Sequence, residues 1–235
     1  YRRQRQMCIR DRMYMKQILI IGNSGGIGKA LETAFKDRGD EVTGLSRSKD
    51  GFDITNEASV EQGLQALKGN FDIVFVATGA LTTPGSHPEK SLSQLSLTAM
   101  TEQFLLNAAG PAMVLKYSKQ LLRKDMPSIF AALSARVGSI GDNRLGGWYS
   151  YRAAKSALNQ LIHSASIELK RTHPKSICVA LHPGTVKTEL TKKYVAGHPA
   201  ITPDEAANHL LSVLENVSPE QSGLFFDWSG KQVEW

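Results

Sequence analysis

Short apolar segments of strand-forming residues alternate with amphipathic segments along this 235-residue chain, and this alternation limits the fold more than any other feature. Strands are expected at residues 17–21, 41–45, 52–53, 73–76, 128–133, 177–181 and 224–226. Helices are expected between them, at 29–35, 56–67, 97–108, 111–122, from about 150 to 169, and at 203–214. Strands that alternate with helices pair in parallel, so we predict an α/β fold: a single-domain, doubly wound parallel sheet flanked by helices.

Two helices are predicted from their apolar spacing. Leu97, Met100, Phe104 and Ala108 recur at helical intervals, on a long helix that also carries Asn107. A second stripe is expected to be the buried face of the helix that starts near Ser150: Leu158, Leu161, Ile162, Ala165 and Leu169.

A glycine-rich turn joins the first predicted strand to the first helix. It reads Gly22-Asn-Ser-Gly-Gly26-Ile-Gly28, with the spacing G-x-x-x-G-x-G. Glycines let the backbone bend tightly and approach a ligand, and the helix that follows offers free N–H groups to a pyrophosphate. The turn therefore indicates a dinucleotide site, with a tight turn that binds no ligand as the alternative.

Further polar and glycine residues fall where other strands end. Asp53, Gly79, Ser134 and Pro183 each lie at or just beyond the carboxyl end of a predicted strand. Open parallel sheets bind ligands at this edge, so we expect these residues and the glycine turn to line one site.

Tyr151 and Lys155 lie four residues apart in Tyr-Arg-Ala-Ala-Lys, which places them on the same face of a helix. A cation beside a phenol favours the phenolate and lowers the tyrosine pKa. The pair is therefore a candidate general acid/base with its cation, and an exposed helical pair is the alternative.

Taken together, these motifs resemble the short-chain dehydrogenase/reductase family over residues 16–235. Asp53-Ile-Thr55 resembles the family's adenine-contacting segment, and Asp72-Ile-Val-Phe-Val-Ala-Thr-Gly79 takes the place of its Asn-Asn-Ala-Gly. His182-Pro-Gly-Thr-Val-Lys-Thr188 resembles the Pro-Gly segment over the nicotinamide. Three further segments are similar to the C-factor-like and sniffer-type carbonyl reductase branch: Gly138-Ser-Ile, Trp148-Tyr-Ser-Tyr151 and Asp227-Trp-Ser-Gly.

The resemblance implies a Rossmann-type fold and hydride transfer between a nicotinamide and a carbonyl or secondary alcohol. Tyr151 would be the general acid/base, Lys155 would shift its pKa and hold the nicotinamide ribose, and Asn107 would position a water. The family serine is displaced, because Ala135 stands at its position and Ser134 comes one residue earlier. A bulge or an early strand end could turn Ser134 inward; the alternatives are another hydroxyl, such as Ser139, or no serine.

The second strand ends in Ser46-Arg47, without the carboxylate that usually holds an NAD ribose. Arginine suits a 2′-phosphate, so NADP(H) is the expected cofactor and NAD(H) the alternative. The expected cofactor-binding residues are Gly22, Ser24, Gly26, Ile27, Gly28, Ser46, Arg47, Asp53, Ile54, Ala77, Gly79, Lys155, Pro183, Gly184, Val186 and Thr188.

Charge and composition exclude several classes of function. Residues 1–12 contain five arginines and one aspartate and so carry +4 of the net +6. We interpret them as a non-native or disordered leader before a single NAD(P)-binding domain at 13–235, and we expect no nucleic-acid partner. No apolar stretch approaches the length of a membrane span, and no hydrophobic signal core is present, so a cytoplasmic protein is expected. Cys8 and Cys178 form no disulfide pattern, and the histidines lack metal-ligand spacing.

Two readings of function remain from the sequence. The first is an enzyme acting on a small carbonyl or alcohol substrate, and the second is a C-factor-like signalling or regulatory protein with weak or no turnover. Members of the family commonly pair through the two long helices, which predicts a homodimer. Residues 141–148 could obstruct that contact, and a monomer is then expected.

Overall fold

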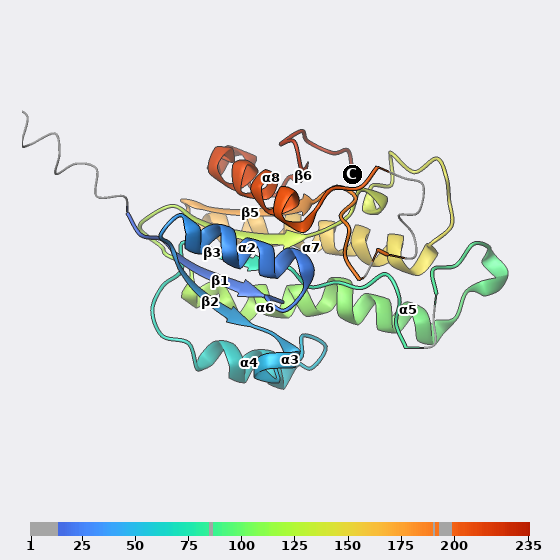
Figure 1. The fold of residues 1–235 in the computed structure, drawn as a ribbon, viewed down its shortest axis with the longest axis horizontal. Helices are drawn as coiled ribbons and strands as arrows, with labels where there is room; N and C mark the ends of the chain where they lie inside the picture. The colour runs from blue at the N-terminus through green and yellow to red at the C-terminus, as the bar shows by residue number, and fades with distance from the viewer. Residues whose placement is uncertain (1–13, 85–86, 190, 193–198) are drawn as a thin grey trace, which may run out of the picture.

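The computed structural model describes residues 14–84, 87–189, 191–192 and 199–235, so the predicted leader at 1–12 lies outside the described residues. Six parallel strands form one sheet in the order β2-β1-β3-β4-β5-β6 (Figure 1). Their bounds are β1 Gln17–Ile21, β2 Glu41–Leu45, β3 Ile73–Val76, β4 Ser128–Leu133, β5 Ser176–His182 and β6 Phe225–Asp227. The predicted fold class, a doubly wound parallel sheet flanked by helices, is confirmed.

Helices cover both faces of the sheet because successive strand side chains point to opposite sides. Ile18 and Ile20 pack with the helices α2 (Gly26–Asp37) and α8 (Pro203–Asn216). Leu19 and Ile21 pack on the other side, with α4 (Glu57–Gln65), α6 (Gly110–Ser118) and α7 (Tyr149–Thr172). Full burial of such a side chain contributes about 1.5–3 kcal/mol, so this alternation determines which way each strand faces.

Three local predictions need correction. Residues 52–53 form no strand. Phe52 N–H donates to Ser46 O, and Asp53 N–H donates to the Ser59 hydroxyl, so neither backbone N–H group is free to pair with a neighbouring strand. Leu161 is exposed and does not belong to the buried stripe of α7. The helix predicted over 97–108 is α5 (Leu97–Phe104) followed by a π-helical turn over Leu105–Ala109.

The apolar stripe on α5 faces outward. Leu97 is 82% exposed, and Met100 and Phe104 are also exposed, whereas Ala99 and Gln103 form the buried side. Helical spacing alone identified the helix correctly but did not tell which face it buries.

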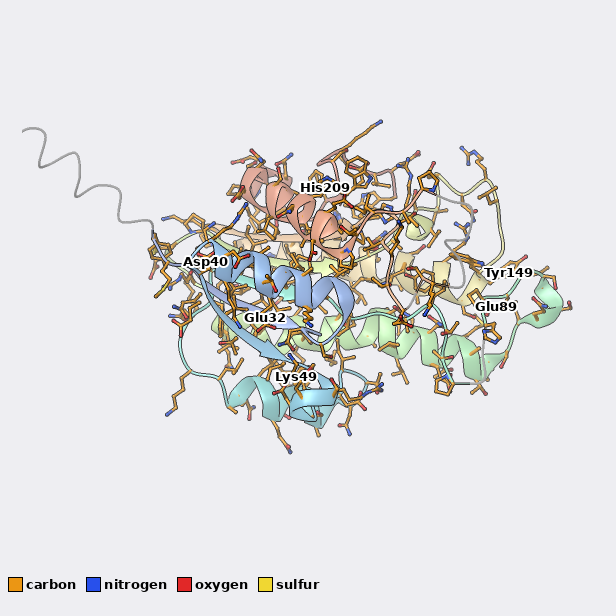
Figure 2. All side chains as sticks on the ribbon, in the orientation of Figure 1. Glu32, Asp40, Lys49, Glu89, Tyr149 and His209 are labelled. Carbon is orange, nitrogen blue, oxygen red and sulfur yellow. The ribbon has the colours of Figure 1, made fainter. Side chains whose placement is uncertain are left out.

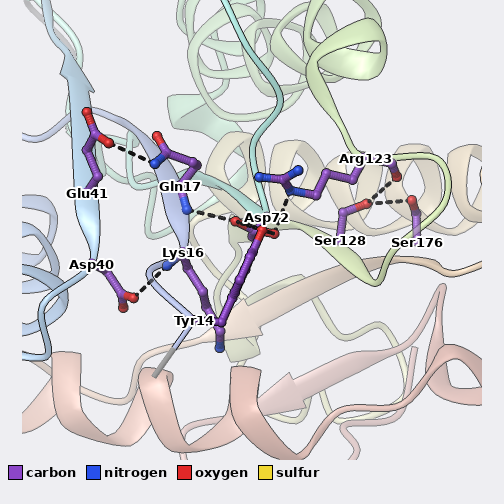
Figure 3. Close-up of polar contacts among 9 residues, drawn as sticks. All are labelled: Tyr14, Lys16, Gln17, Asp40, Glu41, Asp72, Arg123, Ser128 and Ser176. Carbon is purple, nitrogen blue, oxygen red and sulfur yellow. Dashed lines mark hydrogen bonds and ion pairs between the residues drawn. The ribbon is translucent and has the colours of Figure 1, made fainter. Parts of the chain in front are cut away.

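The amino end of the sheet is closed by a polar cluster (Figure 3). Asp72, directly before β3, accepts hydrogen bonds from Tyr14 Oη (3.1 Å) and Gln17 N (2.7 Å), and it forms an ion pair with Arg123 Nε (2.7 Å). Ser128 and Ser176, at the starts of β4 and β5, share a hydrogen bond of 2.7 Å. These contacts tie the chain before β1 to the loops between later strands.

Candidate active site at the carboxyl end of the sheet

Two cavities of about 350 Å³ each lie at the carboxyl end of the sheet, on either side of the glycine turn. Ser24, Ala77 and Gly79 line both of them. The predicted cofactor residues that line one or both are Gly22, Ser24, Gly26, Ile27, Ser46, Arg47, Asp53, Ile54, Ala77, Gly79, Lys155, Pro183 and Thr188. Gly28, Gly184 and Val186 line neither cavity.

The glycine turn delivers the start of α2 to both cavities. Gly22 adopts φ 91°, and a methyl group at Gly28 would lie 2.2 Å from Gly22 O, so neither position tolerates a side chain. No side chain caps α2, and the N–H groups of Ile27 and Gly28 have no backbone acceptor among the hydrogen bonds of the described residues. An uncapped helix start beside a cavity fits a phosphate or pyrophosphate group.

The first cavity, beside β2, is lined by Ser46, Arg47 and Asp53. Asp53 accepts hydrogen bonds from Thr55, which hold the pKa of its carboxyl below the ordinary value, and the charge of Arg47 adds to this shift. Asp50 accepts from both the backbone N–H and the hydroxyl of Ser46 (2.8 and 3.2 Å). Ser46 is thus bonded to Asp50, whereas Arg47 brings a cationic side chain to this wall of the cavity.

The second cavity is lined by Tyr151 and Lys155 of α7. Lys155 is 2% exposed; its Nζ donates to Leu133 O (2.8 Å) and lies 5.8 Å from the centre of the Tyr151 ring. Burial lowers the pKa of Lys155 to about 7. Burial also raises the pKa of Tyr151, which is opposite in sign to the lowering expected from a neighbouring cation.

Asn107 lies in the π-helical turn, directly behind Gly79. Its Oδ1 accepts from Ala80 N (3.2 Å), and its Nδ2 donates to Ala80 O (2.9 Å) and Gln103 Oε1 (2.7 Å). A methyl group at Gly79 would lie 3.1 Å from Asn107 Oδ1 and 3.4 Å from Lys155 Nζ. Gly79 therefore lets Asn107 and Lys155 approach the same point; π-helical turns are frequent at functional sites.

Ser134 follows β4 and lines the second cavity, but its hydroxyl donates to Asn159 Oδ1 on α7 (2.6 Å). It would have to leave Asn159 to donate to a substrate. Ala135, the next residue, has extended backbone and lines neither cavity. Ser139 is buried and accepts from Asp142 N (3.1 Å). The role of Ser134 stays a prediction.

The Pro183-Gly184 segment follows β5 and closes the far side of the cavity. Gly184 adopts φ 81°, and a methyl group there would lie 3.1 Å from Trp228 Cδ1. Thr188 packs over the glycine turn, with Cγ2 at 2.9 Å from a methyl group built on Gly26. Val186 is buried and pairs with Ile201, so it supports this segment from behind.

The residues around the site that were not predicted from the sequence include Gln103, Thr78 and Glu89. Gln103, which orients Asn107, lies four residues before it, and this helical spacing was an available signal. Thr78 lines both cavities, and its buried hydroxyl has no partner in the described part of the chain. Glu89, which contacts the start of α7, comes from a distant loop that no local pattern connects to that helix.

The comparison with family models decides the family. A model described as Enoyl-(Acyl carrier protein) reductase, one of the short-chain dehydrogenases/reductases, matches residues 21–223. The chain belongs to the short-chain dehydrogenase/reductase family. The resemblance read from the sequence is confirmed, and so is the expectation that the chain is an oxidoreductase of this family.

Two curated relatives of this short-chain dehydrogenase/reductase align over much of their length. The 1-hydroxy-2-glutathionyl-2-methyl-3-butene dehydrogenase of Rhodococcus sp. (strain AD45) is 30% identical over 94% of this chain and 100% of its own. C-signal of Myxococcus xanthus is 34% identical over 62% of this chain and 84% of its own.

Two solved structures share the fold. The carbonyl reductase Sniffer of D. melanogaster superposes with a TM-score of 0.75 at 20% identity, over 94% of this chain and 100% of its own. A short-chain dehydrogenase/reductase-type protein of Burkholderia multivorans with bound NADP has a TM-score of 0.73 at 26% identity, with the same coverage.

Among the described residues, no group of three or more His, Cys, Asp or Glu side chains could hold a metal ion. In the same residues, no helix is both long and apolar enough to cross a membrane.

Proposed function

We propose that this chain is an NADP(H)-dependent oxidoreductase that transfers hydride between the nicotinamide and a carbonyl or secondary alcohol, with residues 13–235 as the NAD(P)-binding domain. The observation that carries the proposal is that Asn107 and Lys155 both approach Gly79. Lys155 lies one helical turn after Tyr151, and both side chains line a cavity beside the uncapped start of α2. When bound, the nicotinamide supplies the hydride, and the protein supplies orientation and proton transfer.

Tyr151 is proposed to hold the substrate oxygen and exchange a proton with it. Burial raises the pKa of Tyr151, so the phenol is protonated at neutral pH, as reduction of a carbonyl requires. Lys155 would hold the nicotinamide ribose, and Asn107 would position a water that links Lys155 to solvent. Gly22, Ser24, Gly26, Ile27 and Gly28 would hold the pyrophosphate at the start of α2.

The remaining contacts divide between the two ends of the cofactor. Ser46, Arg47, Asp53 and Ile54 would contact the adenosine, and Ala77 and Gly79 the middle of the cofactor. The segment that closes over the nicotinamide would use Pro183, Gly184, Val186 and Thr188.

Arg47 supports NADP(H) as the preferred cofactor, with NAD(H) as the alternative. Because Asp50 holds the donors of Ser46, a 2′-phosphate would face the Arg47 guanidinium instead. The NADP-bound relative from Burkholderia multivorans supports the same choice. Arg47→Asp is expected to raise the Michaelis constant for NADPH sharply and leave that for NADH little changed; an unaltered ratio of the two would remove this assignment.

The test of the proposed function is NADPH oxidation with a panel of aldehydes, ketones and quinones. A glutathione-conjugated alcohol, assayed in the oxidative direction with NADP⁺ and NAD⁺, belongs in the panel because the Rhodococcus relative is named for such a substrate. Turnover of at least one compound, lowered about 10³-fold in Tyr151→Phe, is the expected result.

A signalling or regulatory protein that binds nucleotide with weak turnover is the second candidate. Ala135 in place of the family serine and the similarity to C-signal favour it. Tight NADPH binding without turnover of any compound in the panel would support it over the oxidoreductase.

A homodimer is proposed through the exposed face of α5 and α7. Leu97, Met100 and Phe104 of α5 are exposed there, and Met100 and Phe104 line a groove of about 370 Å³ whose other wall includes Ala153 and Ala157 of α7. A monomer at micromolar concentration in light-scattering measurements would contradict this. The expected cytoplasmic location stays a prediction.

A further inference from the structure

A carboxylate from a loop far away in the sequence meets the start of the helix that carries Tyr151 and Lys155. Glu89 lies between β3 and α5 and is 4% exposed. Figure 2 places it beside Tyr149, the first residue of α7. Its carboxylate accepts a short hydrogen bond from the Ser150 hydroxyl and a second bond from Ser150 N (3.3 Å). Its carbonyl accepts from Trp148 N (2.5 Å).

Helix α7 does not supply these acceptors itself. The residue before it, Trp148, has left-handed backbone with φ 51°, and an indole carries a donor but no acceptor for the free N–H groups of a helix start. The first turn of α7 contains no acidic residue. Helices α4 and α8, by contrast, have a cap within their own segment: Asn56 accepts from Ser59 N at α4, and Thr202 accepts from Glu205 N at α8.

The contact lies next to the proposed chemistry. Ser150, which makes both bonds to the carboxylate, directly precedes Tyr151, and the Trp148 ring meets the Tyr151 ring edge-on at 6.4 Å between centroids. A negative charge at a helix N-terminus interacts favourably with the backbone dipoles. Because α7 is anchored on one side by Lys155 at Leu133 O, a second anchor at Ser150 fixes the helix segment between them.

We infer that Glu89 is a positioning residue for catalysis. From a loop distant in the sequence, it supplies the N-terminal cap that α7 itself lacks, and so it holds the Tyr151 hydroxyl at the angle needed for proton transfer. Glu89 touches neither substrate nor cofactor in this role. The inference rests on the proposed function of Tyr151 and adds a residue that the family motifs do not contain.

The test compares Glu89→Ala and Glu89→Gln with Glu205→Ala as the matched control. Glu205 is also a carboxylate bonded at a helix start, through Thr202 N and Oγ1, but its helix α8 carries no proposed catalytic residue. We expect Glu89→Ala to lower kcat about 10–100-fold, since small displacements of a reacting group have effects of this size, with the Kd for NADPH within about twofold of wild type. Glu89→Gln keeps an acceptor for Ser150 N–H and is expected to recover most of kcat. Glu205→Ala is expected to lower the melting temperature and leave kcat unchanged.

Hydrogen exchange at the first turn of α7 gives a readout that needs no turnover. Faster exchange at Ser150 and Tyr151 in Glu89→Ala, with unchanged exchange there in Glu205→Ala, is the expected result. If the wild type reduces no carbonyl compound, the proposed function fails, while the exchange data still decide whether Glu89 orders the start of α7.

Two results would overturn the inference. One is an unchanged kcat in Glu89→Ala. The other is that Glu89→Ala and Glu205→Ala both lose kcat, and that each loss follows the loss of stability of that variant in the same proportion. If Glu89→Ala does not fold, Ser150→Ala removes the hydroxyl partner of the carboxylate and is judged by the same criteria, a lower kcat at constant NADPH affinity.

Discussion

The two ends of the sheet use buried polar groups in opposite ways. At the amino end, Asp72 is surrounded by Tyr14, Gln17 and Arg123, and each contact joins segments far apart in the sequence (Figure 3). At the carboxyl end, the hydroxyl of Thr78 has no partner among the described residues, and burial lowers the pKa of Lys155.

The difference indicates what each end contributes. Removing one partner at the amino end is expected to destabilise the fold, because it leaves the buried groups that remain without compensation. Unpaired or desolvated groups at the carboxyl end cost stability and keep their hydrogen-bonding capacity for a ligand. Changes at the first end should therefore affect unfolding, and changes at the second should affect turnover.

The largest effect is expected for Tyr151→Phe. Removal of a general acid/base typically lowers the rate about 10²–10⁴-fold, and we expect a fall of about 10³-fold in kcat. The free energy of unfolding should stay within about 0.5 kcal/mol of wild type, as expected for a change that leaves packing intact. Activity above one tenth of wild type would remove Tyr151 from the proposed role.

Asp72→Ala tests the amino end. We expect the free energy of unfolding to fall by about 3 kcal/mol in urea denaturation, because Arg123 and Gln17 N lose their acceptor. The control is Asp40→Ala, which removes an acceptor of Lys16 N (3.0 Å) and should cost about 1 kcal/mol. Both variants should keep kcat within about twofold of wild type, since neither touches the cavities. A larger loss of kcat in Asp72→Ala than in Asp40→Ala would contradict the claim that the amino end of the sheet affects stability and not turnover.

Lys155→Met should have an effect on stability that depends on pH. Burial lowers the pKa of Lys155 to about 7 in the folded chain, against an ordinary value of 10.5. Below pH 7 both states bind the proton, and the full cost of burying the charge is present. Between pH 7 and 10.5 the unfolded state binds more protons, so the wild type gains stability as pH rises. We expect the free energy of unfolding of Lys155→Met at pH 6 to exceed that of wild type by on the order of 2 kcal/mol, a figure that already includes the loss of the hydrogen bond to Leu133 O. By pH 10 this advantage should be lost. An advantage independent of pH would contradict the assigned protonation.

Ala135→Ser and Ser134→Ala address the displaced serine. Position 135 is where the resemblance places the family serine, so we expect a hydroxyl there to donate to the substrate oxygen and to raise kcat about tenfold, a modest part of what such donors usually contribute. Ser134→Ala then decides its own role: a loss of about 100-fold keeps Ser134 as the donor, and an unchanged kcat shows that its hydroxyl serves Asn159 alone. No gain in Ala135→Ser would mean that position 135 does not face the substrate.

Local sequence patterns predicted most of the architecture, because strands and helices follow from the spacing of apolar residues. β1 and β2 have the predicted bounds, and Asn56 caps α4 as expected, although that helix ends at Gln65 and not near Leu67. Residues 52–53 were wrongly predicted as a strand, because pairing depends on neighbours that a two-residue segment does not provide.

The candidate site was predictable to the extent that its motifs are local. The glycine turn and the spacing of Tyr151 and Lys155 are short-range features, and the structure brings them to one edge with Gly79. The direction of the Tyr151 pKa shift was not predictable from the motif, since burial raises this pKa and burial depends on packing by segments that the motif does not contain. Glu89 was missed because its contact with Ser150 joins positions 61 residues apart.

The central claim is that the carboxyl end of the sheet transfers hydride, and deuterium transfer tests it most directly. NADPH that carries deuterium at the reactive C4 position is incubated with the carbonyl panel and the products are analysed by mass spectrometry. The account predicts one deuterium on the former carbonyl carbon with wild type and Asp72→Ala, and none above background with Tyr151→Phe. NADPH binding by all three proteins without deuterium in any product would contradict it.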